Sequence, residues 1–421
     1  MKNYLLLLVF VILFFAQQLN TAEKEKYTFL YNSKLDMYSG AENVLSLYKL
    51  TGRYEDKLLE KIKWNEDTIL NRIAGIGFRL AKISFWNVRI GDWFIMMQDV
   101  YFGNGARLRE YSIPVKYKIT NIWTTYSWNY TIDWSNVSDE QKLGIISGGP
   151  EGRQVIAQTA RLKCLEEDNY KWYEIVPIAG QFDTSFFIFF NKYSSDVREY
   201  KWRMSRHYLN YYVNITYSDY EEIYSYTVND MQKGAWWNLC DPLLLYTMFY
   251  GGYKYIVYDQ KTFKNPMIKI TDDVSFLPGT KYNLTPIGGD YYLYGYLKVF
   301  KKLFVAYYRE GGDKYSTASG LGFSGNNIID SGKISLNASF DYWNQPEFIY
   351  NVQHSGNWWY YYPNKTYPEY KRGFNGEFMA TYKLNDVLSL NYGFGYKDIG
   401  YLIGKPYNKG AYSYAGFTVS F

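Results

Sequence analysis

Hydrophobic and polar positions alternate along much of the chain after residue 276. Large apolar residues, Ala or Gly occupy every second position in 334–342, 374–384 and 388–396, and Ser, Asn, Lys and Glu are common between them. A period of two predicts β-strands with one apolar and one polar face. Strands of about ten residues, joined alternately by short turns and longer loops, are typical of transmembrane barrels. We therefore predict that residues 276–421 form an antiparallel meander that completes a barrel.

The periodicity is different in the first two thirds of the chain. In residues 23–110, apolar positions recur at intervals of three and four, which predicts a mainly helical region. Residues 111–275 mix both periods. The expected elements are helices at 42–62, 66–85, 90–101, 151–167 and 236–250, a hairpin at 113–119 and 126–132, and a candidate strand at 208–217.

Together these patterns predict an α+β fold. We expect a transmembrane antiparallel β-barrel of about ten strands, within a range of roughly 8–14, with several helices in its lumen or on its periplasmic side. A soluble β-sandwich also has alternating strands and turns. The strand lengths, and the Tyr and Phe residues near strand ends on the apolar face, favour the barrel.

The first residues predict export from the cytoplasm. A short basic start is followed by an apolar run from residue 4 to 16 and by small polar residues up to Ala22. The run is too short to span a bilayer, so residues 1–22 are expected to be a secretory signal peptide, with an uncleaved anchor as the alternative. The two cysteines, Cys164 and Cys240, could form one disulfide in an exported chain or be two separate thiols.

The last residues form another alternating segment. Phe417, Val419 and Phe421 share one face, while small or polar residues occupy the other. Chain ends usually fray in water, whereas the last strand of a barrel must pair with the first. This ending resembles that of bacterial outer-membrane β-barrel proteins, in which a terminal aromatic residue is the assembly signal. The resemblance implies a location in the cell outer membrane, with outer-membrane lipid and the barrel-assembly machinery as partners.

The composition adds one feature and excludes one class of partner. The chain contains 49 tyrosines, and Tyr suits either the membrane–water interface or a surface on which sugars stack. The net charge of +5 is small and dispersed, so nucleic acid is not an expected partner.

Candidate catalytic chemistry is sparse. The only histidines, His207 and His354, lie in different regions and lack metal-ligand neighbours at helical spacing. There is no His-Glu-x-x-His, Gly-x-Ser-x-Gly or P-loop sequence. We therefore expect no cofactor.

The segment 98–110 is unusual because it gathers polar and charged residues at a junction between helix and strand. It contains Asp99, Asn104, Arg107 and Glu110, and Glu151 follows a Gly-Gly-Pro sequence further along. In the simplest interpretation, Gly103 and Gly105 end a helix, and the charged side chains satisfy its last carbonyls. Such a cluster would have a structural role.

The same segment resembles a degenerate form of the zinc helix His-Glu-x-x-x-His-Gly-Ala-Arg, found in a group of membrane-barrel proteins. Asp99 and Asn104 stand where the resemblance requires histidines, and Val100 replaces the glutamate. An amide is a poor zinc ligand, and Val cannot act as a general base. The resemblance thus implies a site, with Glu151 as a third acidic position, that has lost its metal and its base.

Three functions follow from these observations. The first is an outer-membrane barrel with a non-enzymatic role in transport, adhesion or envelope structure. The second is a barrel-borne hydrolase or its inactive descendant. The third is a secreted, soluble protein that binds carbohydrate through its aromatic residues. The pattern favours the first and names no ligand.

Overall fold

The computed structural model describes residues 25–32, 34–60, 68–120, 128–135, 137–190, 197–201, 203–204, 226–313, 316–346 and 370–421. The predicted signal peptide, the candidate strand at 208–217 and both histidines lie outside these residues.

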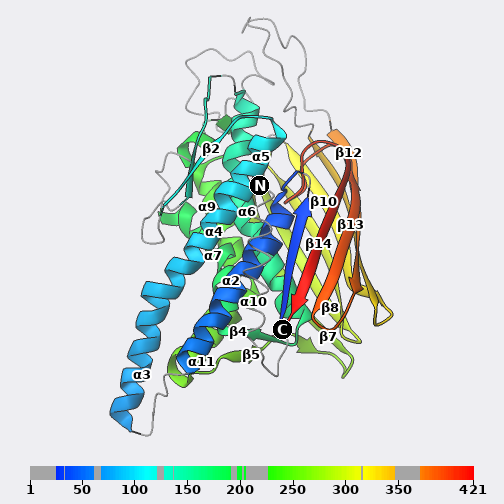
Figure 1. The fold of residues 1–421 in the computed structure, drawn as a ribbon. Coiled ribbons are helices and arrows are strands. Elements are labelled where there is room, and N and C mark those ends of the chain that lie inside the picture. The colour runs from blue at the N-terminus through cyan, green and yellow to red at the C-terminus, as the bar shows by residue number, and fades with distance from the viewer. Residues whose placement is uncertain are drawn as a thin grey trace, which may run out of the picture.

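A ten-stranded antiparallel sheet forms one side of the molecule and helices form the other (Figure 1). The predicted α+β class with about ten strands is confirmed. The sheet is open, with β1 and β6 as its outermost strands. In spatial order the strands are β1 (Lys26–Asn32), β14 (Gly410–Ser420), β13 (Leu388–Lys397), β12 (Tyr370–Lys383), β11 (Ile334–Pro346), β10 (Thr317–Asp330), β9 (Lys302–Gly312), β8 (Gly288–Val299), β7 (Val274–Thr285) and β6 (Ile268–Lys269).

Helices make up most of the chain before β6. None of the helices in the described part of the chain is both long and apolar enough to cross a membrane. They include α2 (Met37–Glu60), α3 (Ile69–Lys82), η1 (Ile83–Asn87), α4 (Val88–Met97), η2 (Gln98–Asn104), α5 (Gly105–Glu110), α6 (Asp139–Glu166), η3 (Trp172–Glu174), α7 (Ile175–Phe190), α9 (Val228–Leu239), α10 (Pro242–Leu245), η5 (Tyr246–Gly251) and α11 (Gly252–Tyr258). The predicted hairpin forms its own two-stranded sheet from β2 (Lys116–Ile119) and β3 (Trp128–Thr131), and β4 (Asn169–Lys171) pairs with β5 (Thr262–Lys264).

The structure corrects the sequence prediction at several helix boundaries. Residues 26–32 were expected in a helical region but form β1. Gly103 and Gly105 do not end a helix, because helical turns continue without a break from α3 through α5. Helix α6 begins well before residue 151, at a capping box in which Ser138 and Gln141 bond each other's backbone amides. The predicted helix at 236–250 is divided at Asp241, which caps α10.

The two faces of the sheet have the chemistry that the alternation predicted. Large apolar side chains on β10 to β13 point outward and are exposed, as Phe378 (45 %) and Phe394 illustrate. Their polar neighbours, including Asn375 and Lys397, point inward and are buried. This distribution is the reverse of that in a water-soluble sheet protein.

The main hydrophobic core lies between the inner face of β8 and β9 and the helices α2, α6 and α7. Tyr292, Tyr294 and Tyr296 of β8 contribute stacked rings to it. Polar groups on the same face pair with one another: Arg309 Nη1 lies 2.8 Å from Asp290 Oδ2, with both side chains almost fully buried. Helix α6 therefore packs against the inside of the sheet.

Side chains of α2 bond the free edge of β1. Asn43 accepts a hydrogen bond from the Leu30 amide and donates one to the Leu30 carbonyl, both at 2.8 Å. Ser46 does the same for Thr28, at 2.9 and 2.7 Å. These four backbone groups would otherwise lack strand partners.

At the opposite end, β6 pairs only with Ser275 and Phe276 of β7, so the rest of β7 is also an edge. Other helices bond this edge in the same way. Asn238 of α9 accepts from the Tyr282 amide and donates to the Tyr282 carbonyl. Asp241 accepts from the Thr280 amide at 3.0 Å, and Gln181 of α7 donates to the Thr280 carbonyl at 2.8 Å. Amide and carboxylate side chains thus replace a neighbouring strand at both ends of the sheet.

The last strand, β14, pairs with β1, but this pairing does not close the sheet into the predicted barrel, because β1 and β6 are not bonded to each other. Phe417, Val419 and Phe421 do share one face, but that face is covered at its end. Phe421 is only 9 % exposed, its ring is 4.9 Å from that of Tyr27, and Arg53 donates to its carbonyl. Phe421 is therefore a packed residue, whereas a freely lipid-exposed position was expected.

Cys164 is buried, Cys240 is exposed, and both are free thiols. Of the two alternatives for the cysteines, the structure therefore has separate thiols.

Candidate functional site

A close crossing of η2 and α6 brings together residues from the predicted site. A Cβ atom on Gly103 would lie 2.5 Å from the carbonyl oxygen of Gly148, a distance that no side chain could tolerate without a backbone shift. The two glycines allow the helix backbones to touch. As a result, Arg107, one turn beyond η2, reaches Glu151 of α6.

Arg107 and Glu151 form a fully buried ion pair. Arg107 Nη2 lies 2.7 Å from each carboxylate oxygen of Glu151. Burial raises the pKa of the Glu151 carboxyl above its ordinary value, while Arg107 opposes this rise by favouring the charged form. Burial acts to lower the pKa of Arg107, but Glu151, Tyr407 and Glu110 together outweigh it and the pKa is raised. One nitrogen of Arg107 thus reaches both carboxylate oxygens at the short distance typical of a charge-assisted hydrogen bond.

This ion pair holds the loop of residues 398–409, which folds inward between β13 and β14. The Gly404 amide donates to Glu151 at 2.7 Å, and Arg107 donates to the Lys405 carbonyl at 2.9 Å. Glu110, which also contacts Arg107 at 3.2 Å, accepts from the Asn408 amide at 2.8 Å. We call these three side chains, Arg107, Glu110 and Glu151, the loop latch.

The loop itself is shaped to meet the latch. Gly404 has a φ of +77°, a left-handed conformation that glycine adopts most readily. Tyr407 lies under the guanidinium of Arg107, whose Cζ is 3.6 Å from the ring centroid. Lys405 reaches in the other direction, to Glu377 of β12 and to the Tyr414 hydroxyl of β14. The loop thus connects the helices to the inside of the sheet.

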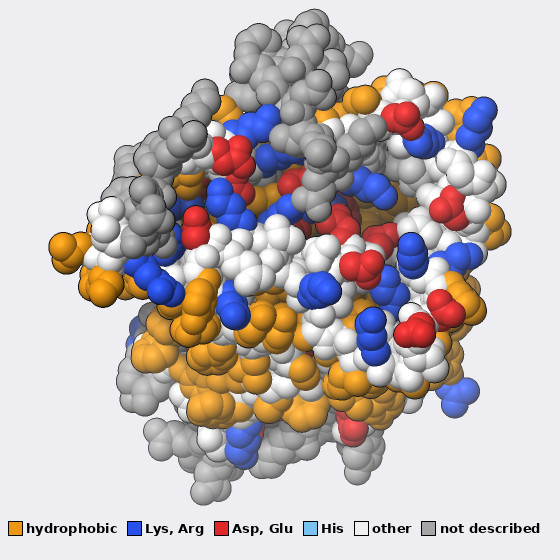
Figure 2. All heavy atoms as spheres, turned by 90° about the horizontal axis from the view of Figure 1, so that it is seen from below, with side chains coloured by type: hydrophobic (Ala, Val, Ile, Leu, Met, Phe, Trp, Pro, Cys, Tyr) orange, Lys and Arg blue, Asp and Glu red, His pale blue; other side chains and the backbone are white. Residues whose placement is uncertain are grey.

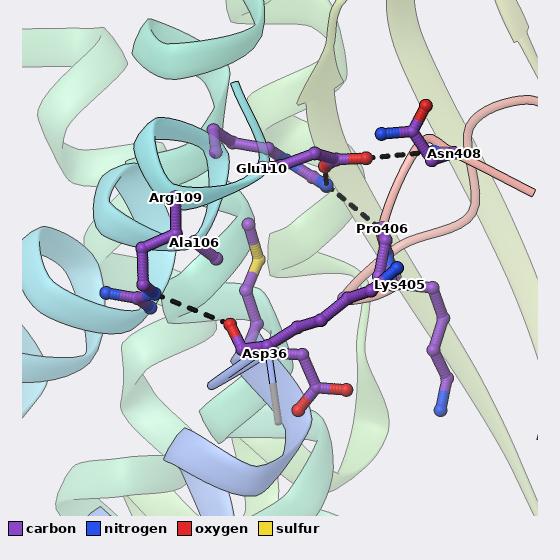
Figure 3. A pocket seen from close by; sticks show the side chains of 11 residues that line it. Asp36, Ala106, Arg109, Glu110, Lys405, Pro406 and Asn408 are labelled. Carbon is purple, nitrogen blue, oxygen red and sulfur yellow. Dashed lines mark hydrogen bonds and ion pairs between the residues drawn. The ribbon is translucent and has the colours of Figure 1, made fainter. Parts of the chain in front are cut away.

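A cavity of about 260 Å³ lies beside the latch (Figure 3). In this view Glu110 reaches Asn408, and Lys405 and Asp36 lie below them. Arg109 donates to the Leu35 carbonyl at 2.7 Å, which fixes the turn before α2. The charged groups around this cavity are therefore mostly bonded to the protein itself.

Asp99 and Asn104 lie on the other side of the helix crossing. Arg153 pairs with Asp99. The Asn104 side-chain oxygen is buried and has no hydrogen-bond partner among the described residues. Both residues line a cavity of about 90 Å³ together with Tyr200. The five predicted site residues therefore divide into the latch and this separate pair.

The two carboxylates proposed as metal positions are bonded to different arginines, Asp99 to Arg153 and Glu151 to Arg107. Within the described ranges, no three His, Cys, Asp or Glu side chains are grouped so that they could hold a metal ion. That the cluster holds no catalytic zinc remains a prediction, which metal analysis of the purified protein tests. Stoichiometric zinc that is lost on changing Asp99 would contradict it.

A larger, polar cavity of about 480 Å³ lies where α6 ends, near the start of β1 and the end of β14. Seen from below, charged side chains surround a hollow and hydrophobic side chains cover the adjoining face (Figure 2). The cavity is lined by residues of both charges and by many hydroxyl and amide groups, among them Lys26, Glu42, Lys163, Glu166, Asn337, Thr381, Asn391 and Thr418. Its lining comes from the inward face of the strands and from α2 and α6.

Sequence reasoning did not identify the 398–409 loop as part of the site. Gly404 of the loop is 253 residues after Glu151 in the sequence, and no periodic pattern connects the two. Three glycines or prolines within it, at Gly400, Gly404 and Pro406, indicated a shaped connection but not its position in space.

Comparisons with known proteins add little to this description. No family model matches the chain, and no curated protein matches it. Among solved structures, the chain is similar to a NanC porin in a rhombohedral crystal form, with 15 % identity over 36 % of this chain and 74 % of that one. The TM-score is 0.25, so this similarity supports no argument about function.

Proposed function

We propose that this protein is an integral outer-membrane barrel protein with a non-enzymatic role in the envelope. The observation that carries the proposal is the inverted polarity of the sheet. Exposed Phe, Tyr and Leu side chains cover the outward face of β10 to β13, and buried polar and charged groups line the inward face. Lipid outside and a protein-filled interior account for this distribution.

The hydrogen bonds that helices make to the sheet edges support the same proposal. In hydrocarbon, each backbone amide or carbonyl without a hydrogen-bond partner costs roughly several kcal/mol, because no water is available to bond it. Asn43 and Ser46 at β1, and Asn238 and Asp241 at β7, bond groups that would otherwise be unpaired. A sheet in water would not need this arrangement, since solvent can bond an exposed edge.

The interior favours a structural or adhesive role over passive diffusion through a pore. Helix α6 and the 398–409 loop occupy the inward side of the sheet, where Arg161 and Asp241 form a second buried ion pair at 2.9 Å. Moving these elements would separate buried charges, at a cost of roughly 3–5 kcal/mol for each unpaired group. We infer a barrel that remains filled in its resting state.

Two neighbouring residues on β12 provide a matched test. Phe378 points outward and Met379 points toward the interior cavity. Phe378→Arg should reduce membrane insertion by about 2–4 kcal/mol, whereas Met379→Arg should cost less because its side chain can reach the polar interior. Fractionation of outer membranes and heat-modifiable electrophoretic migration measure both variants.

Recovery of the unaltered protein as a soluble monomer would contradict the membrane proposal. Equal tolerance of the two arginine variants would do the same. In planar bilayers, we expect no stable open conductance from the unaltered protein. A large steady conductance would instead make it a pore.

A further inference from the structure

The polarity of α3 and η1 is inverted, as it is in the sheet. Ile69 and Leu70 are 80 % and 79 % exposed, and Phe85 is 71 % exposed. The basic residues Arg79 and Lys82 are buried, at 5 % and 8 %. A helix on a water-facing surface shows the opposite arrangement, with its apolar stripe toward the core and its charges outside.

The inward basic residues bond neighbouring helices, which fixes the orientation of α3. Lys82 Nζ lies 2.8 Å from Glu55 of α2 and 2.6 Å from the Tyr255 hydroxyl of α11. It also lies 3.8 Å from the ring centroid of Trp172. Arg79 donates to the Ile256 carbonyl at 2.8 Å. Turning α3 about its axis to hide the apolar stripe would therefore break these buried contacts.

Neighbouring helices extend the exposed apolar surface toward the sheet. Phe249 of η5 is 72 % exposed, and Phe190 of α7 and Trp236 of α9 are also exposed. Trp237, the next residue on α9, donates to the Tyr292 carbonyl of β8. The outward residue that follows on β8 is Leu293, so the helical surface continues into the apolar face of the sheet. Figure 2 shows that hydrophobic side chains gather on one side of the molecule.

The length of the inverted helix suits a bilayer. The 14 residues of α3 and the 5 of η1 span about 28 Å at 1.5 Å per residue. The hydrocarbon core of a typical bilayer is about 30 Å thick.

We propose that α3 and η1, with the exposed side of η5 and α11, contact lipid acyl chains and complete the membrane-facing wall beside the ten strands. This inference rests on the proposed membrane location. Lipid is the occupant because the surface is continuous with the apolar face of the sheet. Moreover, Arg79 and Lys82 are turned away from it and bonded inside the protein, while the exposed Arg72 lies near the start of α3, over the ring of Tyr258.

Spin labels test this arrangement in vesicles of dioleoylphosphatidylcholine. In a Cys164→Ala, Cys240→Ser background, single labels are placed by Ile73→Cys on α3 and, as the reference on the sheet, by Phe378→Cys on β12. Collision with oxygen reports hydrocarbon, and collision with a water-soluble nickel chelate reports solvent. We expect both labels to show high oxygen and low nickel accessibility. Leu80→Cys, also on the exposed side of α3, repeats the measurement if Ile73→Cys does not fold.

The outcomes separate the inference from the proposal on which it rests. High nickel accessibility at Ile73 with a lipid-exposed Phe378 would overturn the inference and leave the membrane location intact. Low accessibility to both reagents at Ile73 would also overturn it, since protein, such as a second copy of this chain, would then cover α3. High nickel accessibility at Phe378 would contradict the membrane location itself.

Discussion

Changing Arg107 to Met should destabilise the protein more than removing its partner. The change leaves Glu151, which has no exposed surface, with the Gly404 amide of the loop as its hydrogen-bond donor. Removing one member of a buried ion pair costs about 3–5 kcal/mol. Glu151→Met should cost less, about 2–3 kcal/mol, because Arg107 keeps Glu110 and the Lys405 carbonyl.

The double variant Arg107→Met, Glu151→Met should be more stable than Arg107→Met alone. Removing both charges leaves an apolar contact and a few lost hydrogen bonds, so we expect a loss of about 1–2 kcal/mol. The loss should therefore fall at least about 3 kcal/mol short of the sum of the single losses. Denaturant unfolding in lipid vesicles, followed by tryptophan fluorescence, measures the four proteins. Additive losses would refute the pairing on which the latch is built.

Proteolysis shows whether the lost stability belongs to the loop. Tyr401 and Tyr407 are buried in the 398–409 loop, so chymotrypsin should cut there in Arg107→Met and not in the unaltered protein. The matched control is Arg153→Met, which breaks the ion pair between Arg153 of α6 and Asp99 of η2 and leaves the three latch side chains in place. Equal cutting of both variants within the loop would mean that the latch does not hold it.

Further predictions concern pH, the sheet edge and the chain end. Without Arg107, the folded-state pKa of Glu151 rises further above its ordinary value, so stability that is present near pH 4.5 is lost as the pH rises toward the raised pKa. The unfolding free energy of Arg107→Met at pH 5 should therefore exceed that at pH 8 by at least about 1 kcal/mol. No difference would argue against a buried carboxylate. Asn43→Leu leaves two backbone groups of β1 unpaired and should cost about 2–4 kcal/mol of unfolding free energy, and a neutral change would mean that water reaches that edge. Phe421→Asp should impair insertion far more than Ser420→Asp in a membrane-assembly assay, since Phe421 is packed; equal effects would contradict its packed position.

The strands of the last third were predictable because a single local rule determines them. Along β11 to β13, a period of two assigns each residue to the outward or inward face, and the structure agrees. Strand β1 escaped prediction because it has only seven residues and precedes a long helix directly. Its role depends on pairing with β14, nearly 400 residues later, as in the contact of Thr28 with Thr418.

For the helices, periodicity located the apolar stripes but did not establish whether they face the core or the outside of the protein. The apolar positions at intervals of three and four in 66–85 correctly indicated a helix there. Such a stripe is usually taken to face a core, yet Ile73 and Leu80 point outward and Lys82 points inward. The direction is set by Glu55 on α2 and by groups on α11, partners that the sequence alone does not bring together.

Helices supply hydrogen-bond partners at both edges of the open ten-stranded sheet. If α2 alone were removed, the backbone groups of Leu30 and Thr28 would lose their partners, and Phe421 would lose the apolar cover of Leu47 and Leu50. Without α9, the edge of β7 would be open as well. A protein of this design cannot be shortened to its ten strands, because the same helices that fill the interior also supply the last hydrogen bonds of the sheet.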